Sequence, residues 1–288
     1  MNPMTRRTFI ATAAAACAAP LLRSEEKPAA ATGLDFPLMD FHVHLDKSTI
    51  DAVLALSQAR GVKFGIVEHA GTKENDYPVV LSNDKELKSY LDMLAGKPVF
   101  RGVQAEWIDW TSGFSTKALA QLDYVLTDTM TFPGKDGRRT KLWLKDVESL
   151  VEMADKQAFM DRFVDWHVKI ISEQPIDILA NTSWLPAPLA IDYDALWTPA
   201  RVQKVVDAAV KHCVALEISS SYKLPRLPFL KIAKAAGVKF SFGSNGRYPK
   251  MGLLDYSIAM AKELGLKRSD MFTPVPDGRK AVQRWKRG

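Results

Sequence analysis

Cysteine is scarce in this chain of 288 residues, which contains only Cys17 and Cys213. Because Cys17 lies in a segment that we expect to be removed, Cys213 would have no partner, and an intramolecular disulfide is excluded. Cys213 comes directly before an apolar stretch, and we therefore expect a small buried side chain. The sequence also lacks internal repeats, a domain linker and the Gly-x-Gly-x-x-Gly turn of dinucleotide-binding folds.

Charge of either sign is not concentrated anywhere along the chain. The formal net charge is +6, and the first 31 residues hold four basic and two acidic side chains, so the remainder keeps +4. Nucleic-acid-binding proteins carry Lys/Arg-rich blocks, and none is present. We therefore expect a small-molecule substrate, with a slight preference for anions, and no nucleic-acid partner.

The N-terminal segment has the pattern of an export signal. Arg6 and Arg7 precede an apolar, alanine-rich run over residues 9–22. Paired arginines before such a run indicate twin-arginine export, and the run is too short for a comfortable membrane span. We predict a signal peptide and short linker over 1–31 and a periplasmic or otherwise exported protein. Acylation at Cys17, which would make it a lipoprotein, stays open.

From residue 37 onward, short apolar strands alternate with amphipathic helices. This alternation predicts parallel strands joined by helical crossovers, and therefore an α/β fold with one domain over 32–288. Seven such units favour a closed or nearly closed barrel, with only a weak eighth strand at 271–273. After a first strand within 37–47, the expected strands are 63–69, 99–106, 124–128, 176–181, 214–219 and 239–245. The expected helices are 48–60, capped by Ser48 and stopped by Gly61, 84–95, 115–122, 156–172, 199–212, 228–236 and 253–264.

Polar residues gather where these strands end, which is the end of a parallel barrel that carries its chemistry. His42 and His44 are two apart on one strand, so both imidazoles can point to the same face and reach one ion. Histidines that merely cap the strand are the alternative. His69 lies on the same rim, whereas His167 and His212 do not. The other rim residues are Glu68, Gln104, Glu106, Asp128, Asn181, Glu217, Asn245 and Arg247.

Three histidines and a carboxylate are enough ligands for one metal ion that keeps a position open for water. We predict one divalent ion (Zn, Mn or Fe) held by His42, His44, His69 and Glu106. Asp128 and Arg247 are expected to be catalytic, Asp128 as a base or further ligand and Arg247 as a counter-charge to the substrate. The expected substrate-binding residues are Glu68, Gln104, Asn181, Glu217, Asn245, Trp107 and Lys223. For Trp107, packing against a neighbouring helix is an equal alternative.

These motifs resemble the polymerase and histidinol phosphatase (PHP) family. His42-x-His44 resembles its opening motif, Glu68-His69 its second, and the 243–247 stretch its closing Gly-Ser-Asp-x-His. The resemblance implies a distorted (β/α)7 barrel, two or three Mn, Fe or Zn ions and phosphoesterase activity. Five of the family's ligand places are lost, being occupied instead by Gln104, Met130 or a neighbour, Asn181, Asn245 and Arg247, so a trinuclear centre cannot form.

The resulting hypothesis is an exported metal-dependent hydrolase that acts on a small polar substrate, including phosphoesters. One alternative is a non-catalytic anion- or sugar-binding protein on a degenerate barrel. Another is a metal-dependent lyase or isomerase. The substrate, the metal and the oligomeric state are left open by the sequence.

Overall fold

The computed structural model describes residues 32–46 and 48–285. The predicted signal segment, 1–31, therefore lies outside the described residues. Among those residues, no helix is both long and apolar enough to cross a membrane. A parallel sheet forms the centre of the fold, in the strand order β1-β2-β4-β5-β8-β9-β10. Its strands are β1 (Met39–Val43), β2 (Lys63–Ala70), β4 (Phe100–Ala105), β5 (Tyr124–Thr127), β8 (Ile178–Leu179), β9 (Ala215–Ser219) and β10 (Phe240–Gly243), and β3 (Val80–Leu81) pairs with β2.

The sheet curls until its two outer strands meet, which confirms the predicted seven-unit barrel. Val43, the last residue of β1, forms a parallel bridge with Gly246, which lies beyond β10. The His44 amide donates to the Gly246 carbonyl and the Gly246 amide to the His42 carbonyl, both at 2.9 Å. The weak eighth strand is reduced to one bridge between Met271 and Phe240. The barrel is therefore nearly closed without an eighth full strand.

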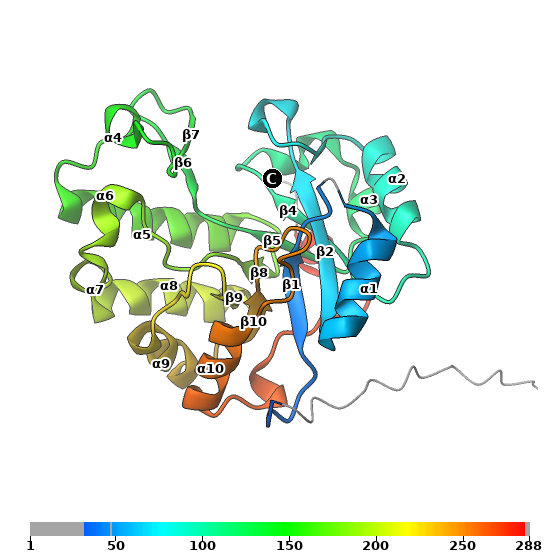
Figure 1. Cartoon of the computed structure of the whole chain (residues 1–288). Coiled ribbons are helices and arrows are strands. Elements are labelled where there is room, and N and C mark those ends of the chain that lie inside the picture. The colour runs from blue at the N-terminus through cyan, green and yellow to red at the C-terminus, as the bar shows by residue number, and fades with distance from the viewer. Residues whose placement is uncertain (1–31, 47, 286–288) are drawn as a thin grey trace, which may run out of the picture.

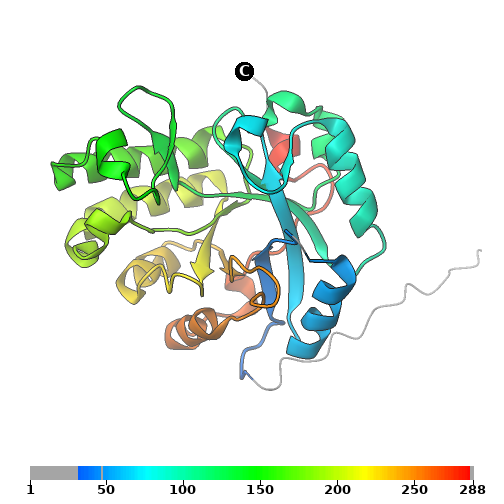
Figure 2. The same cartoon turned by 45° about the horizontal axis from the view of Figure 1, so that its top comes forward.

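Helices surround the sheet on both flanks (Figures 1 and 2). Along one flank run α1 (Ile50–Arg60), α2 (Asp84–Leu94) and α3 (Thr116–Leu119), and along the other α5 (Lys156–Glu173), α8 (Pro199–His212), α9 (Leu227–Ala235) and α10 (Asp255–Leu264). Shorter helices are α4 (Val147–Leu150), α6 (Ala187–Ala190), α7 (Tyr193–Leu196) and α11 (Ala281–Arg284).

Helix ends follow local capping chemistry closely. Gly61 ends α1 in the left-handed conformation, as predicted. The expected cap at Ser48 is wrong, because the hydroxyl of Thr49 accepts from the Ala52 amide. Cys213 is also not buried: it is exposed, as the left-handed C-cap of α8.

Aromatic rings fill the interior of the barrel beneath its carboxyl-end rim. Tyr124 packs edge-on against Phe41, with ring centroids 5.2 Å apart, and donates to the Phe41 carbonyl at 2.7 Å. A Cβ at Gly102 would lie 2.5 Å from the Tyr124 ring, and one at Gly65 would lie 2.4 Å from its hydroxyl. Both strands therefore need glycine beside this ring. This packed interior leaves no room for a site inside the barrel itself, whereas the carboxyl-end rim is where parallel barrels carry their chemistry.

The long polar segment after β5 forms a small separate layer. Strands β6 (Thr131–Pro133) and β7 (Arg139–Lys141) pair as an antiparallel hairpin, and α4 follows them. The hairpin and α4 stand beyond the carboxyl end of the barrel, above α5 in Figure 1. The hairpin reaches the loop that follows β2, since Arg139 donates to Asn75 at 2.8 Å.

Candidate metal centre and polar rim

The end of β1 brings two fully buried histidines to the rim. Neither ring nitrogen of His44 has a hydrogen-bond partner among the described residues. Burial, followed by the nearby His69 and His42, holds the pKa of His44 well below its ordinary value. His44 is therefore a neutral imidazole with free nitrogen, the form that binds metal ions.

The end of β2 adds a carboxylate and a third histidine. Glu68 accepts from the Leu45 amide with Oε1 at 3.1 Å, while its buried Oε2 has no partner in the described chain. Burial, with repulsion from Asp46, raises the pKa of Glu68 to about 7. Ligand atoms of His44, Asp46 and Glu68 all lie within 4.8 Å of one another.

His69 is held in one orientation beside this group. Its Nδ1 lies 2.7 Å from Glu106 Oε1, while its buried Nε2 has no partner among the described residues. Metal-binding histidines commonly donate their second nitrogen to a carboxylate in this way. The His69 ring stacks on His44, with centroids 4.7 Å apart. Burial lowers the pKa of His69 to about 3 and raises that of Glu106 to about 8.

The opposite half of the rim is closed by its own hydrogen bonds. His42 Nδ1 lies 2.7 Å from Glu217 Oε2, and His42 Nε2 lies 3.0 Å from Gln104 Oε1. Gln104 and Asn181 both donate side-chain amides to Asp128 Oδ2, at 3.4 and 3.0 Å. The Asn181 backbone amide donates to Glu217 Oε1 at 3.2 Å, which closes a circle of hydrogen bonds through His42, Gln104, Asp128, Asn181 and Glu217. His42, unlike His44, therefore has partners for both nitrogens.

The pKa values of His42 and Asp128, two members of this hydrogen-bonded circle, follow from burial and pairing. Burial lowers the pKa of His42, but the attraction of Glu217 outweighs it, so the net shift is upward. Burial raises the pKa of Asp128 to about 6, assisted by repulsion from Glu106. Asp128 can thus exchange a proton near neutral pH.

Arg247 places a cation at the mouth of the site. Its Nε donates to Asp46 Oδ2 at 3.0 Å, and its Nη1 donates to Asn245 Oδ1 at 2.6 Å. Its side chain is 42% exposed, so it faces both the ion-binding group and solvent. A hollow of about 340 Å³ opens here, lined by Leu45, Asp46, Ser48, Pro78, Arg247 and Tyr248.

Two predicted substrate-binding residues stand apart from these clusters. Trp107 packs on Trp166 of α5, with ring centroids 5.3 Å apart, which is the alternative that the sequence offered. Lys223 is exposed in the loop after β9. The structure thus assembles Glu68, Gln104, Asn181, Glu217 and Asn245 and leaves these two at the margin.

Backbone strain concentrates at the same rim. Six non-glycine residues within four positions of the carboxyl end of a strand have positive φ angles between 45° and 68°: Asp46, Trp107, Asn181, Ser183, Lys223 and Asn245. Such residues cost free energy and persist where the surroundings enforce them, often at functional sites. Four of the six, Trp107, Asn181, Lys223 and Asn245, are among the site residues predicted from the sequence.

Tyr77 is a rim residue that sequence reasoning missed. Its ring stacks on His69 with centroids 3.6 Å apart and an interplanar angle of 6°. Its hydroxyl interacts with the Glu106 carboxyl and lowers the pKa of that group, against the larger effect of burial. Tyr77 lies in an aperiodic loop after β2, and neither spacing nor composition marks such a position.

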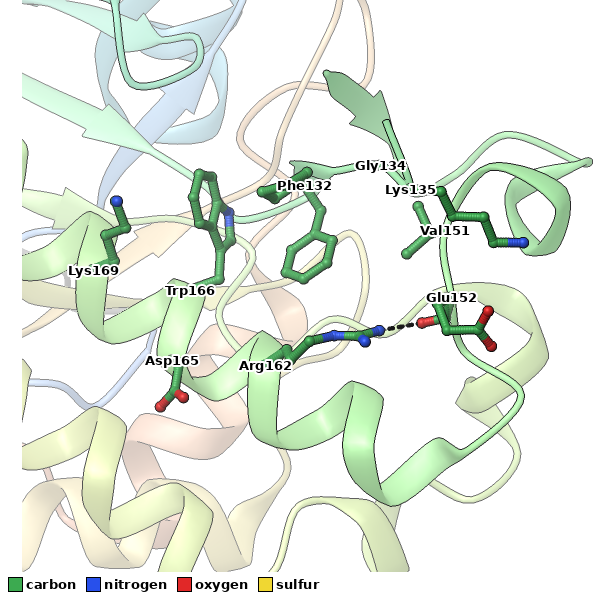
Figure 3. A pocket seen from close by; sticks show the side chains of 10 residues that line it. Phe132, Gly134, Lys135, Val151, Glu152, Arg162, Asp165, Trp166 and Lys169 are labelled. Atoms are coloured by element: carbon green, nitrogen blue, oxygen red, sulfur yellow. Dashed lines mark hydrogen bonds between the residues drawn. The ribbon is translucent and has the colours of Figure 1, made fainter. Parts of the chain in front are cut away.

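A larger hollow lies away from the rim. It measures about 600 Å³ between the β6–β7 hairpin and α5, with Phe132 and Trp166 forming its apolar wall (Figure 3). Arg162 spans part of it by donating to the Glu152 carbonyl. None of the candidate ligands lines this hollow.

Comparisons with known proteins agree with the fold. No protein-family model and no curated protein sequence matches this chain. A crystal structure of histidinol phosphate phosphatase from Lactococcus lactis, in complex with zinc, L-histidinol and phosphate, matches with a TM-score of 0.55 and 11% identity. The match covers 80% of this chain and 94% of that one. The chain therefore has the fold of a PHP-type (β/α) barrel, with polar side chains gathered at the carboxyl ends of its strands.

Proposed function

We propose that this protein is a metal-dependent hydrolase that holds one divalent ion between His44, His69, Asp46 and Glu68. One observation carries the proposal: buried ligand atoms of three of these residues have no hydrogen-bond partner within the described chain. Leaving such atoms unpaired costs about 1–3 kcal/mol each, so a missing partner is expected. Two imidazoles and two carboxylates suit Zn, Mn or Fe.

The other predicted ligands then take supporting roles. Glu106 orients His69 through Nδ1. The circle of hydrogen bonds through His42 and Glu217 holds together the strands that carry the site. An ion at this place supplies water activation and positive charge. Asp128, with a pKa of about 6, is the proposed proton acceptor.

A phosphoester is the proposed substrate class. Arg247 presents a partly exposed guanidinium beside Asp46, and guanidinium groups bind phosphate through paired hydrogen bonds. The hollow beside it could hold a small polar substrate. The protein with the shared fold binds phosphate in its crystal, which is consistent with this choice.

Elemental analysis of protein purified without added metal tests the proposal. About one equivalent of Zn, Mn or Fe is expected in the wild type, and none in His44→Ala. His212→Ala is the matched control, because His212 lies at the end of α8, away from the rim. p-Nitrophenyl phosphate hydrolysis should follow metal content. A protein that takes up no metal on titration would instead favour the anion- or sugar-binding alternative.

Export through the twin-arginine pathway is a separate proposal that rests on Arg6, Arg7 and the apolar run after them. These residues lie outside the described structure. Fractionation of cells that express the full chain should place it in the periplasm. Arg6→Lys combined with Arg7→Lys should retain it in the cytoplasm, and unchanged localisation would refute the proposal.

A further inference from the structure

We infer that Tyr77 is a positioning residue for the proposed ion site and that Lys141, from the β6–β7 hairpin, holds Tyr77 in place. The inference rests on the proposed function, since it concerns the orientation of a proposed ligand, His69. It assigns a role to the long segment between β5 and α5, which the barrel itself does not require.

Stacking fixes the plane of the His69 ring. Tyr77 covers one face of His69 at 3.6 Å and 6°, and His44 lies against His69 at 4.7 Å and 23°. The ring is thus enclosed between two neighbours and cannot tilt without losing contact with one of them.

A hydrogen bond fixes the rotation of the same ring within its plane. Glu106 Oε1 lies 2.7 Å from His69 Nδ1, and the Tyr77 hydroxyl lies beside the same carboxyl group. Tyr77 therefore contacts His69 directly through its ring and indirectly through the carboxylate. Together these contacts keep His69 Nε2, which is buried without a partner in the described chain, pointed at one place.

Lys141 closes the outer face of the stack. Its ammonium lies 4.2 Å from the centroid of the Tyr77 ring and donates to the Asp76 carbonyl at 3.3 Å. A cation over an aromatic face is attracted to it, most strongly where water is displaced. The order from the surface inward is Lys141, Tyr77, His69 and His44.

Arg139, two residues before Lys141 on β7, anchors the hairpin to the loop that carries Tyr77. That loop contains the 3-10 turn Lys73–Asn75. The Arg139 guanidinium is 20% exposed. It donates to Thr72 Oγ1, Asn75 Oδ1 and Glu74 Oε2 at 2.9, 2.8 and 2.9 Å. The hairpin therefore contacts the loop at two points, through Arg139 at residues 72–75 and through Lys141 at residues 76 and 77.

Zn²⁺ affinity of the full-length protein, measured by competition with a chromogenic chelator, tests the inference. Tyr77→Leu is expected to weaken Zn²⁺ binding by about 10–100-fold, the range for loss of residues that orient a ligand. Tyr77→Phe keeps the stack and should lose only a few-fold, and Lys141→Met should fall between wild type and Tyr77→Leu. Unchanged affinity in Tyr77→Leu would overturn the inference.

Two control variants separate positioning from general destabilisation. Tyr256→Leu removes a half-buried tyrosine of α10 whose hydroxyl bonds to the Pro225 carbonyl rather than to a rim side chain. Lys63→Met removes another cation over a ring, 4.3 Å from the centroid of Phe100, at the opposite end of β2. Both should keep wild-type Zn²⁺ affinity. Equal losses in the controls would mean that the effect is not positional.

Histidine-ring NMR spectra of the metal-free protein supply a readout that does not depend on the ion. In the wild type, His69 should carry its proton on Nδ1, with ring protons shifted upfield by Tyr77. Tyr77→Leu should lose this shift, whereas Tyr256→Leu should retain it. If the wild type binds no zinc, the proposed function fails, and the spectra still support or overturn the positioning role.

Discussion

Asp40 holds together the seam where the barrel closes, and its removal gives the most direct test of the architecture. The carboxylate is fully buried and accepts from three backbone amides, those of His42, Ser244 and Gly252, at 3.1, 3.0 and 2.8 Å. It also accepts from the Ser244 hydroxyl at 2.5 Å. These donors lie on β1 and on the chain after β10, so one side chain links the two outer strands.

The magnitude follows from the groups that Asp40→Ala would leave unpaired. Each buried amide without a partner costs about 1–3 kcal/mol. The substitution also removes a buried carboxylate. Burial of that group is unfavourable, as its raised pKa indicates, so its removal offsets part of this cost. We expect a net loss of about 3–5 kcal/mol in the free energy of unfolding. For a domain of this size that corresponds to roughly 10 °C in Tm.

Urea unfolding followed by circular dichroism measures this loss. The midpoint should fall in Asp40→Ala, and Asp40→Asn, which keeps one acceptor oxygen, should lose less. Asp92→Ala is the control, because Asp92 is 63% exposed and pairs only with Lys88 on the same helix. Such surface pairs contribute about 0.3–0.5 kcal/mol. A loss below about 1 kcal/mol in Asp40→Ala would refute the role of this side chain in closing the barrel.

Three further predictions concern the site. Zn²⁺ at about 100 times its Kd should stabilise the wild type by about 2.7 kcal/mol in thermal unfolding, and Glu68→Gln, which removes a ligand charge, should lose most of this gain. The metal-free protein should become less stable from pH 6.5 to 8, because folding raises the pKa of Glu68 to about 7 and of Glu106 to about 8 from 4.5. At these two carboxyls the folded state then binds more protons than the unfolded chain, so their contribution to stability is full below pH 4.5 and is lost as pH rises through the raised pKa values. A urea midpoint that stays flat from pH 6.5 to 8 would contradict this. Arg247→Met should weaken competitive inhibition by inorganic phosphate about tenfold while Zn²⁺ content stays unchanged, and equal inhibition would remove Arg247 from substrate binding.

Much of the fold was predictable because its signals are local. Helix α8 begins at Pro199 and ends at His212, as its periodicity predicted. The hydrophobic strands and their order along the chain followed from the same alternation. Prediction failed where one residue decided the outcome: Thr49 rather than Ser48 caps α1, and Cys213 is exposed because the left-handed C-cap turns it outward. Local pattern does not resolve such single-residue choices.

The sequence by itself determined most of the polar residues that reach the rim, since strand ends in a parallel barrel share one edge, but it missed Asp46 and Tyr77 in the loops beyond those ends. Only the tertiary structure decided how they pair there. His42 and His44 are chemically identical and two residues apart. Glu217, 175 residues away from His42 in the sequence, hydrogen-bonds to His42, whereas the ring nitrogens of His44 have no hydrogen-bond partner in the described chain. Tyr77 lies at the site on a loop whose sequence has no hydrophobic periodicity. Partners across a closed barrel depend on strand register and curvature, which no local stretch of sequence encodes.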